Sequence, residues 1–106
     1  MIVTTGETIP GHQVSKILGV ARGNTIRARH VGRDIMAGLR SIVGGEITDY
    51  TKMIAESREQ SLDRLIAAAK ELDADAIICM RFSTSYVMST AAEILAYGTA
   101  VKTVRK

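Results

Sequence analysis

The sequence of 106 residues is poor in the residues that cross-link or rigidify small proteins. Cys79 is its single cysteine, so an intrachain disulfide cannot form, and Pro10 is its single proline. The segment Met1–Glu7 has no basic stretch leading into a long apolar run, so we expect neither a secretory signal nor a membrane span. With 46% hydrophobic residues, the chain can build its own core. We therefore expect one soluble cytoplasmic domain over residues 1–106.

Motifs that mark common enzyme sites are also missing. No Gly-x-Gly-x-x-Gly or Walker loop is present, because Gly38 and Gly44 lie within or after a predicted helix and not between a strand and a helix. No Gly-x-Ser-x-Gly turn is present either. Cys79, His12 and His30 are far apart in the sequence, and nothing brings them together as a nucleophile and a base. The residues favour a non-enzymatic protein over an enzyme.

The segment from Thr48 to Leu72 has the clearest periodicity in the chain. Its apolar and small residues recur at steps of three and four, which predicts an amphipathic helix. The residues of the predicted dry face are Tyr50, Ile54, Ser57, Ser61, Leu65, Ala68 and Leu72. Such a helix is about 37 Å long, whereas a compact chain of this size has a diameter of about 33 Å. We expect a second copy of the chain to cover the ends of the helix.

Extended segments flank the long helix on both sides. Strands are predicted at Met1–Thr5, at His12–Arg27, from Ile78 to Met88 and at Ala92–Arg105, and a shorter helix from Asp34 to Gly44-Gly45. The chain is therefore expected to be an α+β domain of order β-β-α-α-β-β, in which antiparallel strands pack on a helix pair.

The last two predicted strands differ in their faces. The side of the third strand that is expected to lie on the helices consists of Ile78, Met80, Phe82, Thr84, Tyr86 and Met88. The last strand is apolar on both sides, because Tyr97 alternates with Ile94 and Ala96. Since an antiparallel sheet usually leaves one face wet, we expect another subunit to cover the open face. A strand central to a small domain is the alternative.

The net charge of +3 conceals an uneven distribution. Residues 1–45 have six basic and two acidic side chains, residues 46–75 have four and eight, and residues 76–106 have four and one. One interpretation is a basic surface that binds nucleic acid. The aromatic residues disfavour it, since all of them fall at core-like positions: Tyr50, Phe82, Tyr86 and Tyr97. We favour the other interpretation, that acidic and basic surfaces face each other within or between protomers.

Several segments together resemble the YbjQ-like family of small bacterial and archaeal proteins. They extend over nearly the whole chain and are Gly32–Arg40, Val43–Glu46, Tyr50, Arg58–Gln60, Ala74–Ile77, Met80–Phe82 and Glu93–Val101. The resemblance implies an α+β subunit that assembles into a homopentameric ring, in a family described as heavy-metal-binding but of unknown function. The chain departs from the family pattern at Ser83-Thr84, where an acid is common, and at Ser89-Thr90, where a Gly-Gly turn is common.

Residues that could bind a metal ion are few. Soft metal ions prefer thiolate ligands, and a strong site needs three or four converging Cys, His or carboxylate groups. The candidates are Cys79 and His30, and a ring could bring copies of either together near its axis. Cys79 is more often a small buried hydrophobe in such a position, and His12 and His30 fit ordinary surface histidines.

Glu93 is the most unusual polar residue, because it lies beside the apolar last strand. It could pair with Arg81 across a hairpin, either as a structural contact or as part of a ligand site that includes Tyr97. Three hypotheses follow: a non-enzymatic ring that binds a small ligand or a metal ion at its subunit interfaces, an enzyme with a composite interfacial site formed by these three residues, and a basic nucleic-acid-binding ring. We favour the first.

Overall fold

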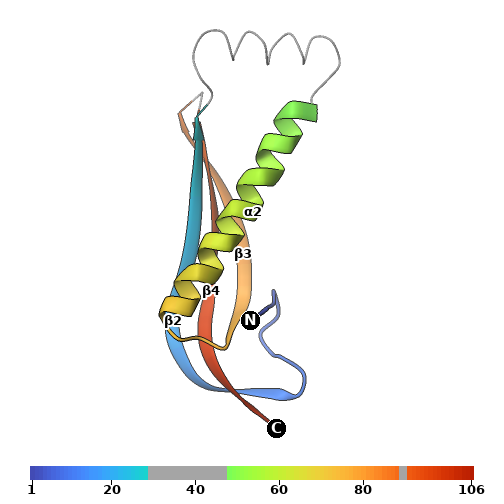
Figure 1. Ribbon diagram of the computed structural model, residues 1–106, viewed down its shortest axis with the longest axis vertical. Helices are drawn as coiled ribbons and strands as arrows, with labels where there is room; N and C mark the ends of the chain where they lie inside the picture. Colours follow the sequence, from blue (N-terminus) through green and yellow to red (C-terminus); the bar gives the residue numbers. More distant parts are fainter. Residues whose placement is uncertain (29–47, 89–90) are drawn as a thin grey trace.

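The computed structural model describes residues 1–28, 48–88 and 91–106. The elements of this part are β1 (Ile2–Val3), β2 (His12–Ala28), α2 (Thr48–Glu71), β3 (Ala76–Met88) and β4 (Ala91–Arg105). They form an α+β domain in which α2 lies on a four-stranded sheet (Figure 1). The predicted long helix and long strands are confirmed to within a few residues. The predicted shorter helix from Asp34 to Gly45 and the predicted turn at Ser89-Thr90 lie outside the described residues.

The strands follow the order β1-β3-β4-β2 across the sheet. β4 pairs antiparallel with β2 on one side and with β3 on the other. β1 pairs parallel with β3 through Ile2 and Val3, so the sheet is mixed and not wholly antiparallel as predicted. The pairing continues beyond β1, since the amide of Met80 donates to the carbonyl oxygen of Thr4 at 3.0 Å. Among the described residues, the N-terminal segment therefore covers only the first part of the β3 edge.

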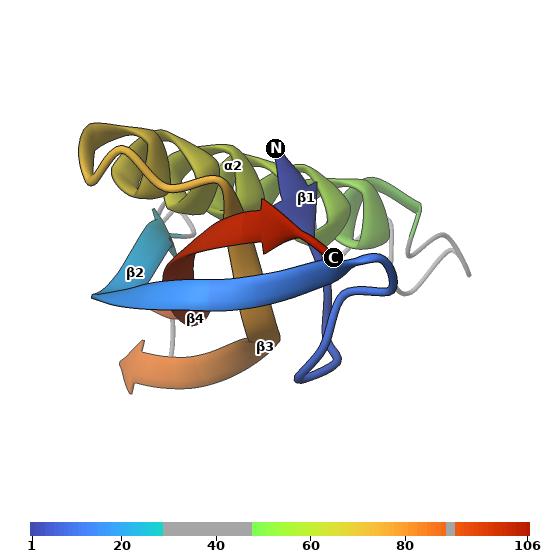
Figure 2. The ribbon, with the colours of Figure 1, turned by 90° about the horizontal axis from the view of Figure 1, so that it is seen from below.

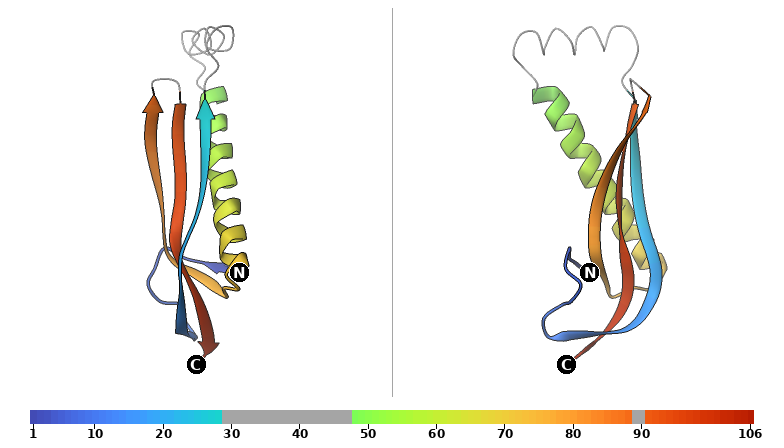
Figure 3. Two further views of the ribbon diagram at one scale, coloured as in Figure 1. Left: turned by 90° about the vertical axis from the view of Figure 1, so that its left-hand side faces the viewer. Right: turned by 180° about the vertical axis from the view of Figure 1, so that it is seen from behind.

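α2 lies along β2 and, to a lesser extent, β4, while β3 lies on the far side of β4 (Figure 3). The residues that α2 buries completely recur every four positions and are Ser57, Ser61, Leu65 and Ala69. A spacing of four keeps one side of a helix toward the sheet, so the predicted dry face is confirmed at its centre. The prediction for Leu72 is wrong: its side chain is 41% exposed because the helix ends at Glu71 and Asp73 adopts a φ of 62°.

Two features of β2 let the helix approach closely and fix its position. Gly23 faces the backbone of α2, and a Cβ there would lie within 3.0 Å of the amide nitrogen of Leu65. The buried hydroxyl of Thr25 forms a hydrogen bond with that of Ser61. Ser61 also donates to the carbonyl oxygen of Ile94 in β4 at 2.8 Å. Because these buried polar groups have partners on three elements, they fix how α2 sits on the two strands.

The domain is long and thin. Its principal extents are 56 × 22 × 16 Å and its radius of gyration is 17.5 Å, whereas a compact chain of this length has a radius of gyration of about 13 Å. The length follows from β2, which has 17 residues at a rise of about 3.3 Å each. A single layer of helix cannot cover both faces of such a sheet. Within the described ranges, one face and the outer part of β3 are therefore left uncovered.

A bulge in β3 and the position of α2 decide which residues of β3 are covered. The register of β3 against β4 shifts by one residue at Cys79 and Met80, and Cys79 has a φ of 56°. Ile78 pairs with Thr99 and therefore lies on the opposite face from Met80, so the prediction that Ile78 shares the side of Met80 is wrong.

Met80 is buried, but Phe82 is 44% and Tyr86 76% exposed. Phe82 pairs with Ala96, which is buried under α2, so Phe82 lies on the predicted side of the sheet. The predicted packing of Phe82 and Tyr86 on a helix is nevertheless wrong within the described chain, because α2 lies over β2 and β4.

Candidate functional site

The face of the sheet turned away from α2 is exposed in the described part of the chain, and we call it the open face (Figure 2). Direct partners in neighbouring strands share a face, so the strand register identifies its residues. They are Val20, Arg22, Asn24 and Ile26 in β2, Glu93, Leu95, Tyr97 and Thr99 in β4, and Ile78, Arg81, Ser83 and Ser85 in β3. Val20 is 69% exposed and Ile26 58%. The open face thus presents apolar groups to solvent beside charged ones.

Three residues of the open face lie in one row across the sheet, and we call Arg22, Tyr97 and Arg81 the basic row. Tyr97 pairs directly with Arg22 of β2 and with Arg81 of β3. The Nη1 atom of Arg81 donates to the carbonyl oxygens of Thr5 at 2.7 Å and Met80 at 2.8 Å. These two contacts hold the guanidinium of Arg81 in place. The row places permanent positive charges on both sides of Tyr97.

Glu93 lies on the open face but apart from the basic row. It is opposite Ser85 of β3, and the Nδ2 atom of Asn24 donates to its carboxylate at 3.0 Å. Four positions along β4 separate it from Tyr97, which corresponds to about 13 Å in a strand. The predicted pairing of Glu93 with Arg81 is therefore wrong. The three predicted ligand residues share one face, but only Arg81 and Tyr97 are neighbours.

Arg22 and Asn24 could not be identified as members of this site from the sequence. The register of β2 against β4 shifts twice between Val14 and Gly19, so counting along the two strands does not give the partner of Tyr97. The alternating pattern of β2 indicates that Arg22 and Asn24 share a face. It does not indicate which face of the sheet that is.

The described residues do not fit a heavy-metal site within one chain. Cys79 is half-buried in the bulge of β3, and its amide donates to the carbonyl oxygen of Gly6 at 3.0 Å. No three His, Cys, Asp or Glu side chains of the described ranges come together. The other candidate ligand, His30, lies outside these ranges. A single thiol does not supply the three or four ligands of a strong soft-metal site.

A cavity of about 280 Å³ lies at the end of the domain where β2 begins and β4 ends. It is lined by Glu7, Thr8, Ile9, His12, Gln13, Val14, Thr103 and Lys106. Its charged groups are of opposite sign and it contains none of the predicted ligand residues. It therefore does not define the chemistry of a ligand.

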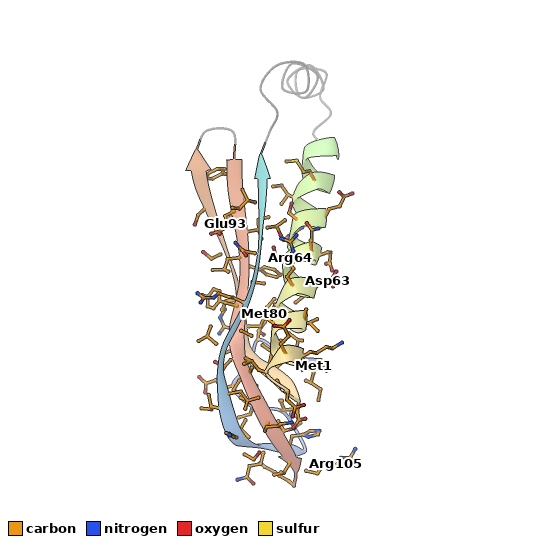
Figure 4. All side chains as sticks on the ribbon, turned by 60° about the vertical axis from the view of Figure 1, so that its left-hand side comes forward. Met1, Asp63, Arg64, Met80, Glu93 and Arg105 are labelled. Carbon is orange, nitrogen blue, oxygen red and sulfur yellow. The ribbon has the colours of Figure 1, made fainter. Side chains whose placement is uncertain are left out.

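α2 presents a second charged surface on the side away from the sheet. Glu56, Glu59 and Asp63 are exposed, and their spacing of three and four places them in one line, which we call the acidic stripe. Asp63 points away from the strands, whereas Arg64 reaches toward β2 (Figure 4) and donates to the carbonyl oxygen of Asn24 at 2.6 Å. Among the described residues, no helix has both the length and the apolar character needed to cross a membrane.

The ion pairs of the described residues lie elsewhere, just beyond the end of α2. The Nζ atom of Lys102 lies 3.1 Å from the carboxylate of Asp73 and 3.8 Å from that of Asp75. The hydrogen bond to Asp73 raises the pKa of Lys102. In this part of the chain, neither the acidic stripe nor the basic row has an oppositely charged partner. Contact between acidic and basic surfaces of different protomers stays a prediction.

A family model described as "Putative heavy-metal-binding" matches residues 1–104. The chain belongs to this YbjQ-like family. A UPF0145 protein of Methanosarcina acetivorans is 57% identical over 102 residues, which are 96% of each chain. A UPF0145 protein of Dehalococcoides mccartyi is 60% identical over 101 residues, which are 95% of this chain and 97% of the relative. The family resemblance is confirmed, and the names of these relatives state no activity.

A solved structure has the same fold as the YbjQ-like chain. It is a protein of unknown function of the DUF74 family from Pediococcus pentosaceus, with a TM-score of 0.67, 18% sequence identity and coverage of 96% of both chains. At this identity the likeness extends to the fold alone. It confirms the α+β class.

Proposed function

We propose that this YbjQ-like protein functions as a homo-oligomeric ring, a pentamer as the family resemblance implies, with a small ligand bound at the subunit interfaces. The observation that carries the proposal is the grouping of apolar residues on the open face, where Tyr97 is 37% exposed and Leu95 lies between Tyr97 and Ile26 by the strand register. The residues of this group are Val20, Tyr97, Leu95 and Ile26. Apolar residues exposed singly are normal on a monomer, whereas a contiguous group framed by polar residues marks an interaction surface. In the proposed ring, the neighbouring subunit covers each open face.

Two unlike surfaces on each protomer support a ring. The open face lies on one side of the sheet, and α2 lies on the other (Figure 2). A contact between two unlike surfaces is heterologous, and it repeats from copy to copy to give a ring where the rotation closes and an open filament where it does not. Burial of the exposed part of Val20 (69%) and Ile26 (58%) would contribute about 1–2 kcal/mol each to the contact.

The proposed ligand binds where assembly covers the polar groups of the open face. Arg81 and Tyr97 are neighbours there, and Glu93 with Asn24 forms a second polar group farther along β4. A neighbouring subunit would exclude water from these groups, and charged groups act more strongly in a low-dielectric environment. A heavy metal ion does not fit one chain, and a ring would have to bring several copies of Cys79 together to hold one.

Native mass spectrometry of the protein as purified, without added metal or chelator, tests this proposal. We expect a complex of five chains of 11.4 kDa, with an excess mass equal to that of the bound ligand. A ring without excess mass would contradict ligand binding. A bare monomer at micromolar concentration would contradict the ring.

The same measurement on Glu93→Gln distinguishes a role of this carboxylate in ligand binding from a role as a subunit contact. The amide oxygen of glutamine still accepts a hydrogen bond from Asn24, so we expect the ring to persist while the bound ligand is reduced. Ser83→Ala, which changes a polar residue of the same face between the two polar groups, is the matched control and should keep both. Dissociation of the Glu93→Gln ring would instead identify Glu93 as a subunit contact.

A further inference from the structure

We infer that the acidic stripe of one protomer binds the basic row on the open face of the next copy, and that these charges select and orient the neighbour. The inference rests on the proposed ring and names the contact that builds it. The partner is a second copy of this chain, which presents both surfaces at once.

The first observation is that charged side chains of the acidic stripe and of the basic row form no ion pair within the described residues. Glu56, Glu59 and Asp63 are exposed, and no ion pair of the described residues includes them. Like charges three and four positions apart on a helix repel each other. Arg22 is likewise exposed and without a hydrogen bond or ion pair in the described ranges. The acidic stripe is negatively charged and the basic row is positively charged. Such complementarity selects partners and fixes their orientation.

The two surfaces also lie at the same level along the domain. Asp63 is next to Arg64, whose guanidinium lies 2.6 Å from the carbonyl oxygen of Asn24. Asn24 is two residues from Arg22 in the same strand. Asp63 and the basic row therefore lie at nearly the same position along the long axis of the domain, on opposite sides of the protomer. Figure 4 shows Asp63 on the outer side of α2. Neighbours placed side by side at equal height bring Asp63 to the basic row.

The guanidinium groups of the basic row are suited to binding carboxylates. A guanidinium can form two parallel hydrogen bonds with one carboxylate. Arg81 uses Nη1 for the two carbonyl contacts, and its Nε and Nη2 atoms have no partner among the described residues. A side chain held in place before binding loses less conformational entropy on binding. Arg81 therefore presents a fixed edge for a carboxylate of the stripe.

A charge exchange between the two surfaces tests the inference. We expect Arg22→Glu and Asp63→Lys, each alone, to raise the subunit concentration at half-assembly by about tenfold or more, because each places like charges together. The doubly substituted chain should recover most of the loss, since it restores opposite charges across the same contact. Sedimentation velocity over a concentration series gives the three midpoints. Circular dichroism of each variant verifies that it is folded.

Two variants with the same charge changes off these surfaces serve as controls. Lys16→Glu reverses an exposed charge elsewhere on β2, and Glu71→Lys reverses one on α2 outside the stripe. Both should leave the midpoint within about threefold of the wild type. The inference would be overturned if the wild type is oligomeric but the double variant assembles no better than the weaker-assembling single variant. That result would leave the proposed ring intact. A monomeric wild type would overturn the proposed ring as well.

Discussion

Replacing Gly23 by alanine is expected to lower the free energy of unfolding by about 3 kcal/mol, a large effect for one methyl group. The added Cβ would lie within 3.0 Å of the amide nitrogen of Leu65, the carbonyl oxygen of Ser61 and the carbonyl carbon of Arg64. These are backbone atoms of a helix, so they cannot turn aside as a flexible side chain can. The helix would have to move away from β2 and weaken the hydrogen bonds of Ser61 with Thr25 and with Ile94.

Urea denaturation at one fixed protein concentration measures this effect, because the stability of an oligomer depends on concentration. Gly6→Ala is the matched control: its Cβ would meet the hydroxyl of Thr4 at 3.6 Å, an ordinary contact. We expect Gly6→Ala to change the free energy of unfolding by less than about 0.5 kcal/mol. A Gly23→Ala protein as stable as the wild type would show that α2 does not lie against β2 as described.

Introducing aspartate at both Val20 and Ile26 is expected to dissociate the proposed oligomer, with the subunit dissociation constant raised by about 100-fold or more. The substitution removes the apolar area that assembly would bury and places two charges at the contact. Both side chains are more than half exposed in the protomer, so the fold of a single chain should be preserved. Sedimentation equilibrium of the variant and the wild type over the same concentrations measures the difference.

Leu72→Asp is the control for this double variant. Leu72 is also an exposed large hydrophobic residue, at 41%, but it follows the end of α2 and does not lie on the open face. We expect this variant to assemble as the wild type does. Equal weakening of assembly by Leu72→Asp would indicate a general dependence on surface hydrophobicity and not a specific role of the open face.

Periodicity predicted the helix–sheet contact well and the uncovered surfaces poorly. The four-residue spacing of Ser57, Ser61 and Leu65 is a local property of α2, so the sequence identifies the side that is buried. Burial of Phe82 and Tyr86 depends instead on where α2 crosses the sheet, which is a property of the whole fold. Their alternation was interpreted correctly as one strand face, but the helix that was expected to cover this face lies over β2 and β4.

The sequence singled out three members of the candidate site but indicated neither their arrangement nor the further members Arg22 and Asn24. Arg81, Glu93 and Tyr97 stood out as polar or amphipathic residues in apolar strands, and all three lie on the open face. Their neighbours are set by bulges in β2 and β3, and a shift of one residue changes every cross-strand partner. For this reason Arg22 was missed as the partner of Tyr97, and Glu93 was placed opposite the wrong residue.

Chemical cross-linking between the outer side of α2 and the open face tests the central claim most directly. A Cys79→Ser chain that also carries Ala67→Cys on α2 and Val20→Cys on β2 has one thiol on each proposed surface, and both replaced residues are exposed and uncharged. With a short bifunctional maleimide, a heterologous ring predicts a ladder of covalent species that ends at the closed ring. Either cysteine alone should then give no dimer. A dimer from a single cysteine, or no cross-linking of the double variant, would contradict a neighbour's α2 lying on the open face.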